Sequence, residues 1–112
     1  MSTPFFLLFR RSIMDKINKF LKKIFIENGD VTHKLVCKDG FRISIGASVF
    51  HHCEPCKNKA WPYKSVQLNF PSELDDLISD YVQDPKEMGT VYSYVPIDIV
   101  NKLIEKHGGI VE

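Results

Sequence analysis

Side chains that could do chemistry are concentrated between positions 51 and 63, beginning with the Cys-Glu-Pro-Cys turn from Cys53 to Cys56. Zinc binds thiolates and imidazoles in a tetrahedron, and a C-x2-C turn is the usual half of a zinc site because it directs both sulfur atoms to one point. Only one of the two adjacent histidines could add a ligand, because neighbours on a strand point to opposite sides. A single C-x2-C turn is a weak indication. We therefore expect three reduced thiols without a metal, and the alternative is a structural zinc held by Cys37, His51, Cys53 and Cys56.

The same turn resembles the C-x-P-C redox turn of thioredoxin-like proteins, but its surroundings differ. That fold requires a long helix after the second cysteine, whereas Pro62 would break a helix that begins here. The chain also lacks a G-x-S-x-G elbow, a Gly-rich phosphate loop and an H-E-x-x-H motif. None of its four histidines is tied by spacing to a nucleophile. The sequence therefore favours a protein that is not an enzyme.

A second candidate site combines aromatic and basic side chains in the segment from Lys57 to Lys64. Aromatic rings beside cations could stack on bases or anchor a protein interface, where Trp, Tyr and Arg carry much of the binding energy. The alternative is that the only tryptophan of a small domain is buried in its core. The hypothesis of a partner-binding loop rests on Trp61, Tyr63, Lys57, Lys59 and Lys64.

Length and charge limit the classes of protein that can carry these sites. A chain of 112 residues fits one small domain, and a net charge of +1 gives no general argument for nucleic-acid binding. No apolar run is long enough to cross a membrane as a helix. Residues 1–26 carry six basic side chains and one acidic side chain, whereas the remainder carries nine basic and thirteen acidic side chains. The sequence thus divides into a basic leader, residues 1–29, and an acidic body, residues 30–112.

The leader has the pattern of an amphipathic helix, with Ser12 as the expected N-cap and Asn28-Gly29 as the stop. A basic amphipathic helix could bind an anionic membrane surface, here through residues 5–24, or an acidic partner. We expect instead that its apolar side covers the protein's own sheet, since most helices are stabilised by such packing. Residues 5–9 do not form an export signal because the arginines follow them and no cleavage site comes after. The predicted apolar stripe comprises Ile13, Ile17, Phe20, Leu21 and Ile24.

The body begins with a predicted β-hairpin on both sides of Lys38-Asp39-Gly40. A three-residue loop with Gly40 in the left-handed conformation would pair Cys37 with Phe41 and direct the Cys37 thiol into the core. A two-residue loop would instead place Cys37 on the opposite face.

Three further elements and a loop follow in the body. Alternation predicts strands at residues 66–70 and 90–94, and either Tyr92 or Tyr94 could face outward on the second of these. Ser72 is the expected N-cap of a helix over residues 72–81, in which Asp75 and Asp76 would lie on the solvated face. A last helix is predicted from Pro96 to the Gly108 stop. The fold class is therefore α+β: a small, mostly antiparallel sheet of about four strands with two packed helices and an N-terminal amphipathic helix.

Several short segments resemble small accessory proteins encoded by tailed bacteriophages and prophages. The resemblance covers about residues 37–112 and omits the basic leader. It carries no activity, and it implies a bacterial host cytoplasm and a function in binding a host protein. The segments are Asp39-Gly40-Phe41, Ile43-Ser44-Ile45, Ala47-Ser48, Phe50-His51-His52-Cys53-Glu54-Pro55, Val66-Gln67-Leu68-Asn69-Phe70-Pro71-Ser72, Val91-Tyr92-Ser93-Tyr94-Val95-Pro96 and His107-Gly108-Gly109-Ile110.

We therefore expect a non-enzymatic, phage-encoded accessory protein that binds and modulates a host or phage macromolecule. The expected partner is a protein, reached through the acidic body or the aromatic loop, and nucleic acid is disfavoured. One alternative is a small zinc-binding module that interacts with nucleic acid through the four ligands named above. A second alternative is a peripheral membrane protein held by residues 5–24. No oligomeric state is predicted.

Overall fold

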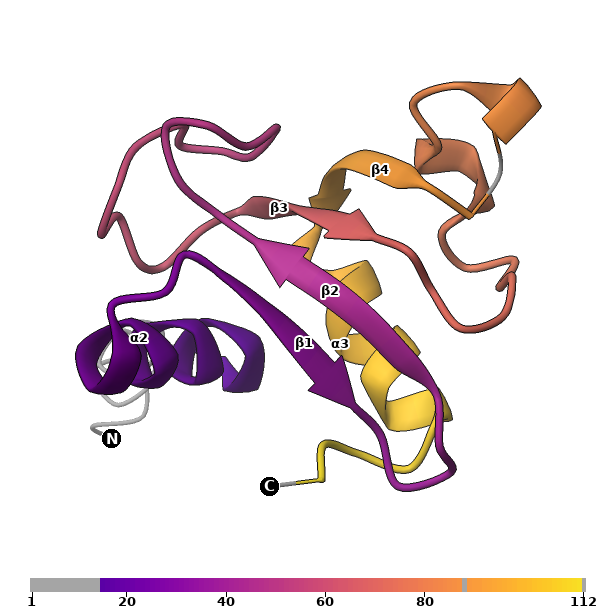
Figure 1. The fold of residues 1–112 in the computed structure, drawn as a ribbon, viewed down its shortest axis with the longest axis horizontal. Coiled ribbons are helices and arrows are strands. Elements are labelled where there is room, and N and C mark those ends of the chain that lie inside the picture. Colours follow the sequence, from indigo (N-terminus) through magenta and orange to yellow (C-terminus); the bar gives the residue numbers. More distant parts are fainter. Residues whose placement is uncertain (1–14, 88, 112) are drawn as a thin grey trace, which may run out of the picture.

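The computed structural model describes residues 15–87 and 89–111 of the chain. The four strands form one antiparallel sheet in the order β1-β2-β3-β4, as Figure 1 shows. This arrangement confirms the predicted α+β class and the antiparallel sheet, with one helix at each end of the described chain. The elements are α2 (Lys16–Asn28), β1 (Thr32–Val36), β2 (Arg42–Gly46), β3 (Ser65–Asn69), the short 3-10 helices η1 (Ser79–Tyr81) and η2 (Pro85–Glu87), β4 (Val91–Pro96) and α3 (Ile97–Lys106).

The hairpin between β1 and β2 has the predicted three-residue loop. The backbone N–H of Cys37 donates to the carbonyl of Phe41 at 2.8 Å, and Gly40 has a φ of +97°. Asp39 stabilises the loop because its Oδ1 accepts the backbone N–H of Phe41 at 2.9 Å. The Cys37 side chain is therefore buried in the core, as predicted.

Helix α2 begins three residues later than its expected cap. Asp15 is the N-cap, and its Oδ1 accepts the backbone N–H of Asn18 at 2.9 Å. Ser12, the cap expected from the sequence, and Ile13 lie outside the described residues. The helix ends as predicted at Gly29, which has a φ of +76°. Its apolar side is buried in the domain's own core through Ile17, Phe20 and Leu21.

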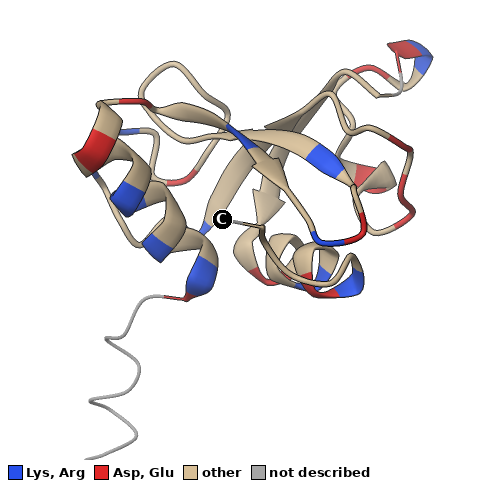
Figure 2. Cartoon of the chain, turned by 60° about the horizontal axis from the view of Figure 1, so that its bottom comes forward, with Lys and Arg blue, Asp and Glu red and all other residues tan. Residues whose placement is uncertain are grey.

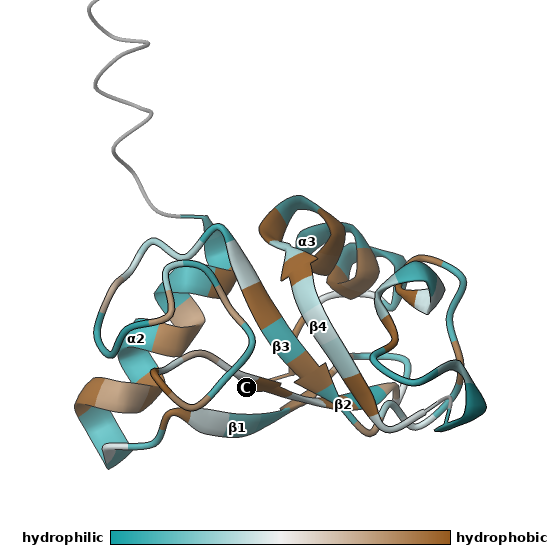
Figure 3. Cartoon of the chain, turned by 90° about the horizontal axis from the view of Figure 1, so that it is seen from above, coloured by the Kyte–Doolittle hydropathy of each residue, from teal (hydrophilic) through white to brown (hydrophobic). Residues whose placement is uncertain are grey.

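The core combines the apolar sides of both helices with one face of the sheet. Figure 3 shows hydrophobic and hydrophilic residues alternating along β3, as expected for a strand with one buried face. The apolar stripe of α3 is buried as predicted, and the helix stops before Gly108, which has a φ of +94°. Fully buried side chains that hold the layers together include Ile17, Leu35, Ile43, Ile45, Val66, Leu68, Tyr92, Val95, Val100 and Leu103.

The helix predicted over residues 72–81 does not form, and turns with the short η1 take its place. The hydroxyl of Ser72 accepts the backbone N–H of Arg42 at 2.9 Å instead of capping a helix. Asp75 is buried rather than solvated, and its Oδ1 accepts the backbone N–H of Leu77 at 3.0 Å. Side chains that bond the backbone in this way compete with helix formation. Leu74, in the same segment, is 60% exposed.

A β-bulge in β4 decides which tyrosine faces outward. Val95 pairs with Val66 and Tyr92 pairs with Leu68, so two residues of β4 lie opposite one residue of β3. The extra residue, Tyr94, has a φ of +52°. Tyr92 and Val95 consequently both face the core, whereas Tyr94 is half exposed on the face of the sheet directed away from the core.

Charge is divided between two parts of the fold, as Figure 2 shows. Helix α2 is basic, with Lys16, Lys19, Lys22 and Lys23 outside its buried stripe. The acidic character of the body is concentrated in the segment between β3 and β4. That segment carries Lys86 and six acidic residues: Glu73, Asp75, Asp76, Asp80, Asp84 and Glu87.

Candidate functional site

The structure places three of the four candidate zinc ligands in the loop that joins β2 to β3. The Sγ atoms of Cys53 and Cys56 lie 3.3 and 3.9 Å from the carbonyl oxygen of Ser48. The thiol of Cys53 is buried, and this burial raises its pKa and favours the protonated form. Cys56 is exposed, and its Sγ also lies 3.5 Å from the carbonyl oxygen of Val49. The C-x2-C turn therefore directs both thiols toward one stretch of backbone.

The other two candidate ligands do not complete a metal site. Both ring nitrogens of His51 are engaged, with Nδ1 2.6 Å from Ser48 Oγ and Nε2 2.8 Å from Thr32 Oγ1. Cys37 lies beyond the far end of β1, because Thr32 pairs with Gly46 at the end of the hairpin where the loop begins. Within residues 15–87 and 89–111, no three His, Cys, Asp or Glu side chains are grouped so that they could hold a metal ion.

Ser48 and His51 have a serine–histidine contact, but its surroundings make it structural. Ser48 is fully buried, and its Oγ also accepts the backbone N–H of Phe50 at 3.0 Å. The group on the other side of the imidazole is the hydroxyl of Thr32 rather than a carboxylate that would stabilise an imidazolium. Burial, followed by the charge of His52, lowers the pKa of His51. The pair therefore fixes the loop and presents no accessible nucleophile.

The aromatic and basic loop packs mainly against α2. Tyr63 is buried, and its hydroxyl accepts the backbone N–H of Ala60 at 3.1 Å and donates to the carbonyl of Lys57. Trp61 is partly buried, with its ring centroid 5.6 Å from that of Phe25.

Two contacts with α2 complete this packing. The side chain of Asn18 bonds the backbone of Tyr63, accepting its N–H at 2.7 Å and donating to its carbonyl at 3.0 Å. The amino group of Lys59 lies 5.4 Å from the centroid of the Phe25 ring. Of the five residues in the partner-binding hypothesis, Lys57, Lys59 and Lys64 are exposed, whereas the aromatic rings stabilise the fold.

A charge cluster centred on the buried His107 and Asp75, with Asp39 and Lys106 half exposed, connects the hairpin loop, the segment after β3 and the end of α3. His107 Nδ1 lies 2.7 Å from Asp39 Oδ2, and His107 Nε2 lies 3.0 Å from Asp75 Oδ2. Lys106 Nζ also contacts Asp75 Oδ2 at 3.0 Å, and the His107 ring stacks on Phe41 at 4.0 Å. Because carboxylates accept hydrogen bonds, the two contacts favour an imidazolium that donates from both nitrogens, and they raise the pKa of His107. Its side chain is only 7% exposed, so the cluster is a structural clamp.

Exposed apolar side chains occur in the loop between β2 and β3 and on β4, and the two elements meet at His52 and Tyr94. Phe50 is 87% exposed, Tyr94 50% and Val49 46%. His52 joins them, because its ring stacks on Tyr94 with centroids 5.6 Å apart and an interplanar angle of 8°. We call Val49, Phe50, His52 and Tyr94 the outer aromatic surface.

Hydrogen bonds fix the backbone beneath the outer aromatic surface. The backbone N–H groups of Val49, Phe50 and His52 donate to the side chains of Asn58, Ser48 and Gln67, respectively, at 2.9–3.1 Å. The backbone N–H of Tyr94 donates to the carbonyl of His52 at 3.0 Å. His52 Nδ1 also lies 2.8 Å from Ser93 Oγ. The exposed rings therefore stand on a braced loop.

Sequence reasoning did not single out this surface. Phe50 lies in a stretch without alternation or helical spacing. The sequence also allowed either Tyr92 or Tyr94 to face outward, and only the β-bulge decides between them. The available signal was the run Val49-Phe50-His51-His52, in which two apolar side chains are followed by two polar ones in a segment without strand or helix spacing. That signal indicates exposure but not which neighbours complete the surface.

Comparison of the chain with protein-family models, with curated proteins and with solved structures gave no match. Among the described residues, no helix has both the length and the apolar character needed to span a membrane. The apolar side of α2 is buried, and the part of the membrane-binding expectation that concerns residues 5–14 lies outside the described residues.

Proposed function

We propose that the chain is a non-enzymatic accessory protein of a phage or prophage that binds a host or phage protein in the bacterial cytoplasm. The observation that carries the proposal is the outer aromatic surface, with Phe50 87% exposed two positions before His52, which stacks on Tyr94. Large aromatic side chains that enter a partner's pocket supply much of the energy of protein interfaces. Two of the segments that resemble phage proteins contain Phe50 and Tyr94, which supports a phage origin.

The hydrogen bonds under the surface favour binding because they lower its entropic cost. Immobilising a flexible side chain at an interface costs about 0.5–1.5 kcal/mol. The backbone at Val49, Phe50 and His52 is already fixed by side chains of the same domain. The stack on His52 likewise limits the orientations of the Tyr94 ring. A partner would therefore meet a largely preformed surface.

Site-specific photocrosslinking in bacterial cells tests whether this surface meets a partner. The photoreactive residue p-benzoylphenylalanine would replace Phe50 in the full chain, and the matched control would carry it at Leu74, which is 60% exposed in the segment before η1. Cells with and without phage infection would be compared. We expect a discrete crosslinked adduct from position 50 and no such adduct from position 74. The crosslinked protein would then be identified by mass spectrometry and purified.

Titration calorimetry with that purified protein tests the role of the aromatic rings. Phe50→Ala should weaken binding at least tenfold, as expected for an interface hot spot, and Leu74→Ala should leave the affinity unchanged. The absence of a discrete adduct at position 50 would overturn the proposal. So would a partner that binds Phe50→Ala and Tyr94→Ala as tightly as the natural chain.

A further inference from the structure

A groove lies between α2 and α3. The C-terminal segment forms its floor and runs beside β1, where the backbone N–H of Lys38 donates to the carbonyl of Gly109 at 2.9 Å. The backbone N–H of Val111 donates to the carbonyl of Val36 at 2.7 Å. The groove has a volume of about 610 Å³, which falls within the range of small-molecule sites.

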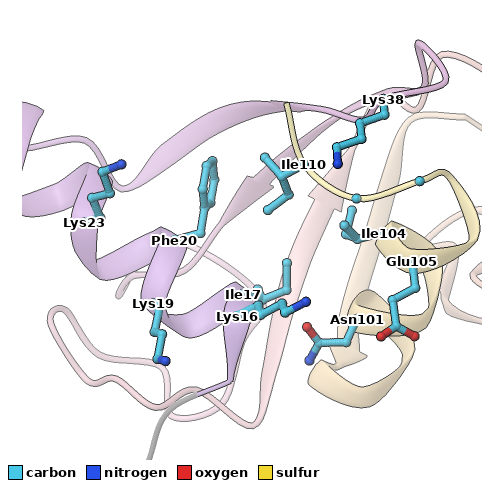
Figure 4. A pocket seen from close by; sticks show the side chains of 12 residues that line it. Lys16, Ile17, Lys19, Phe20, Lys23, Lys38, Asn101, Ile104, Glu105 and Ile110 are labelled. Atoms are coloured by element: carbon cyan, nitrogen blue, oxygen red, sulfur yellow. The ribbon is translucent and has the colours of Figure 1, made fainter. Parts of the chain in front are cut away.

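The inner wall of the groove is apolar. Ile17 and Phe20 come from α2, Ile104 comes from α3, and Ile110 comes from the C-terminal segment (Figure 4). These side chains belong to the core or pack against it, so their positions are fixed by the fold. Ile17 is fully buried beneath the wall, and Phe20 and Ile104 are at most 8% exposed. An aliphatic chain lying in the groove would therefore gain mainly by removing its own methylenes from water, which contributes about 0.8 kcal/mol for each buried methylene.

Positive charge faces the groove from two separate elements. Lys16 projects from the first turn of α2 and Lys38 from the hairpin loop, and Figure 4 shows both amino groups directed into the space between the walls. Within residues 15–87 and 89–111, neither side chain has an ion pair or hydrogen bond. Lys19 and Lys23 add positive charge along α2, and Glu105 is the only acidic residue among those described as lining the groove.

We propose that the groove binds a single-chain anionic amphiphile, with its carboxylate between Lys16 and Lys38 and its aliphatic chain against Phe20, Ile104 and Ile110. Charge complementarity selects the anion, and the enclosed aliphatic walls select the chain. An acidic protein surface would satisfy the lysines but would not fill the apolar wall. This binding is independent of the proposed function at the outer aromatic surface.

Calorimetric titration of the full chain with decanoate, below its micelle concentration, tests the proposal. Two further probes separate the contribution of the charge from that of the aliphatic chain. Decyltrimethylammonium has a chain of the same length with the opposite charge, and butyrate has the carboxylate with a short chain. We expect saturable binding of decanoate and at least tenfold weaker binding of each of the other two. Methyl resonances of Ile104 and Ile110 should shift on addition of decanoate.

Charge variants locate the carboxylate. The double variant Lys16→Glu/Lys38→Glu should bind decanoate at least tenfold more weakly. If that variant does not fold, Lys16→Gln/Lys38→Gln replaces it and should also bind decanoate more weakly than the natural chain. The matched control is Lys34→Glu/Lys64→Glu, because both residues are exposed and neither lines the groove. The control should retain the affinity for decanoate, and Phe50→Ala should retain it as well.

Several results would overturn the proposal. Absence of decanoate binding, equal binding of decyltrimethylammonium, or equal losses in the control pair would each contradict a groove selective for anionic amphiphiles. Binding of a polyglutamate peptide or of phosphatidylglycerol vesicles, without binding of monomeric decanoate, would assign the lysines to an acidic protein or a membrane surface instead.

Discussion

The buried cluster around His107 makes a specific prediction for the pH dependence of stability. Burial alone would lower the pKa of His107, but its hydrogen bonds to Asp39 and Asp75, together with their charges, outweigh that effect and raise the pKa. The pKa of Asp39 is lowered by the N–H of Phe41 and by His107. Burial raises the pKa of Asp75, but hydrogen bonds from Leu77, His107 and Lys106 lower it further than burial raises it. Each partner is therefore stabilised in its charged form.

The size of the change in the free energy of unfolding follows from the single proton that His107 holds. An unfolded histidine has a pKa of about 6.5, so the contribution of His107 is complete below about pH 6.5 and is lost as pH rises through its folded-state pKa. If the folded protein retains this proton, the free energy of unfolding falls by about 1 kcal/mol between pH 6.5 and 7.5, with a limiting slope of about 1.4 kcal/mol per pH unit.

The other groups with shifted pKa values define the pH range in which this decline in the free energy of unfolding can be observed. The lowered pKa of His51 gives a contribution that is present above about pH 6.5 and lost as pH falls. The contributions of Asp39 and Asp75 are present above about pH 4 and lost as pH falls through their lowered pKa values. Burial raises the pKa of Cys37 above 9.0, so ionisation of this thiol affects the free energy of unfolding only at higher pH. Stability should therefore be greatest near pH 6.5.

Urea unfolding followed by Trp61 fluorescence, at intervals from pH 6.0 to 8.0, measures the effect. His107→Gln should remove the decline above pH 6.5 and should destabilise the protein by about 3 kcal/mol, as expected when one partner of a buried ion pair is removed. Asp39→Asn keeps an acceptor for His107 Nδ1 and should reduce the decline if His107→Gln does not fold. The control His52→Gln replaces an exposed ring and should keep the decline.

Two outcomes would refute this reasoning. Constant stability of the natural chain between pH 6.5 and 7.5 would mean that folding takes up no proton at His107. An equal decline in His107→Gln would assign the proton to another group.

Three further substitutions test how the loops are held. Gly46→Ala should destabilise the protein by about 1–3 kcal/mol in urea, because a Cβ there would lie 2.5 Å from His51 Nε2; an unchanged midpoint would show that the imidazole is free to move. Tyr63→Phe should cost about 1–2 kcal/mol by removing the hydroxyl that bonds Lys57 and Ala60, and full stability would contradict that bracing role. Phe70 is exposed with a φ of +51°, so Phe70→Gly should be more stable than Phe70→Ala by about 1 kcal/mol in thermal melts. Equal melting temperatures would rule out strain at this position.

The sheet and the two described helices were predictable because their signals are local. Alternation on both sides of Lys38-Asp39-Gly40 defines the hairpin, and glycine at the last loop position defines its register. The apolar spacing of α3 and the stop at Gly108 likewise depend on neighbours in sequence. Such patterns remain valid whenever tertiary contacts agree with them.

The segment after β3 was mispredicted because its interactions are distant in sequence. Asp75 reads as an acidic residue in a first helical turn, yet its carboxylate meets His107, which lies 32 positions later. Once the carboxylate is buried, it needs this cationic partner, and the requirement outweighs the modest helix preference of residues 72–81.

The surroundings of the candidate site residues likewise depend on tertiary contacts. Spacing shows that Cys53 and Cys56 share a turn, but it does not show that the nitrogens of His51 are occupied by hydroxyls. Similarly, composition identified Trp61 and Tyr63 without showing that α2 covers them. The sequence thus located the chemically distinctive loop, whereas tertiary contacts decided that Phe50, rather than its aromatic neighbours further along, faces solvent.

The two proposed binding surfaces should act independently because they share no residue. The outer aromatic surface belongs to the loop after β2 and to β4, whereas the groove is lined by α2, α3, the hairpin loop and the C-terminal segment. Effects of substitutions that share no partner usually add to within about 0.5 kcal/mol. The triple variant Phe50→Ala/Lys16→Glu/Lys38→Glu should therefore lose partner and decanoate affinity by the same factors as the separate variants. A smaller or larger combined loss, measured by calorimetry on the folded protein, would show that the sheet couples the two surfaces or that one partner covers both.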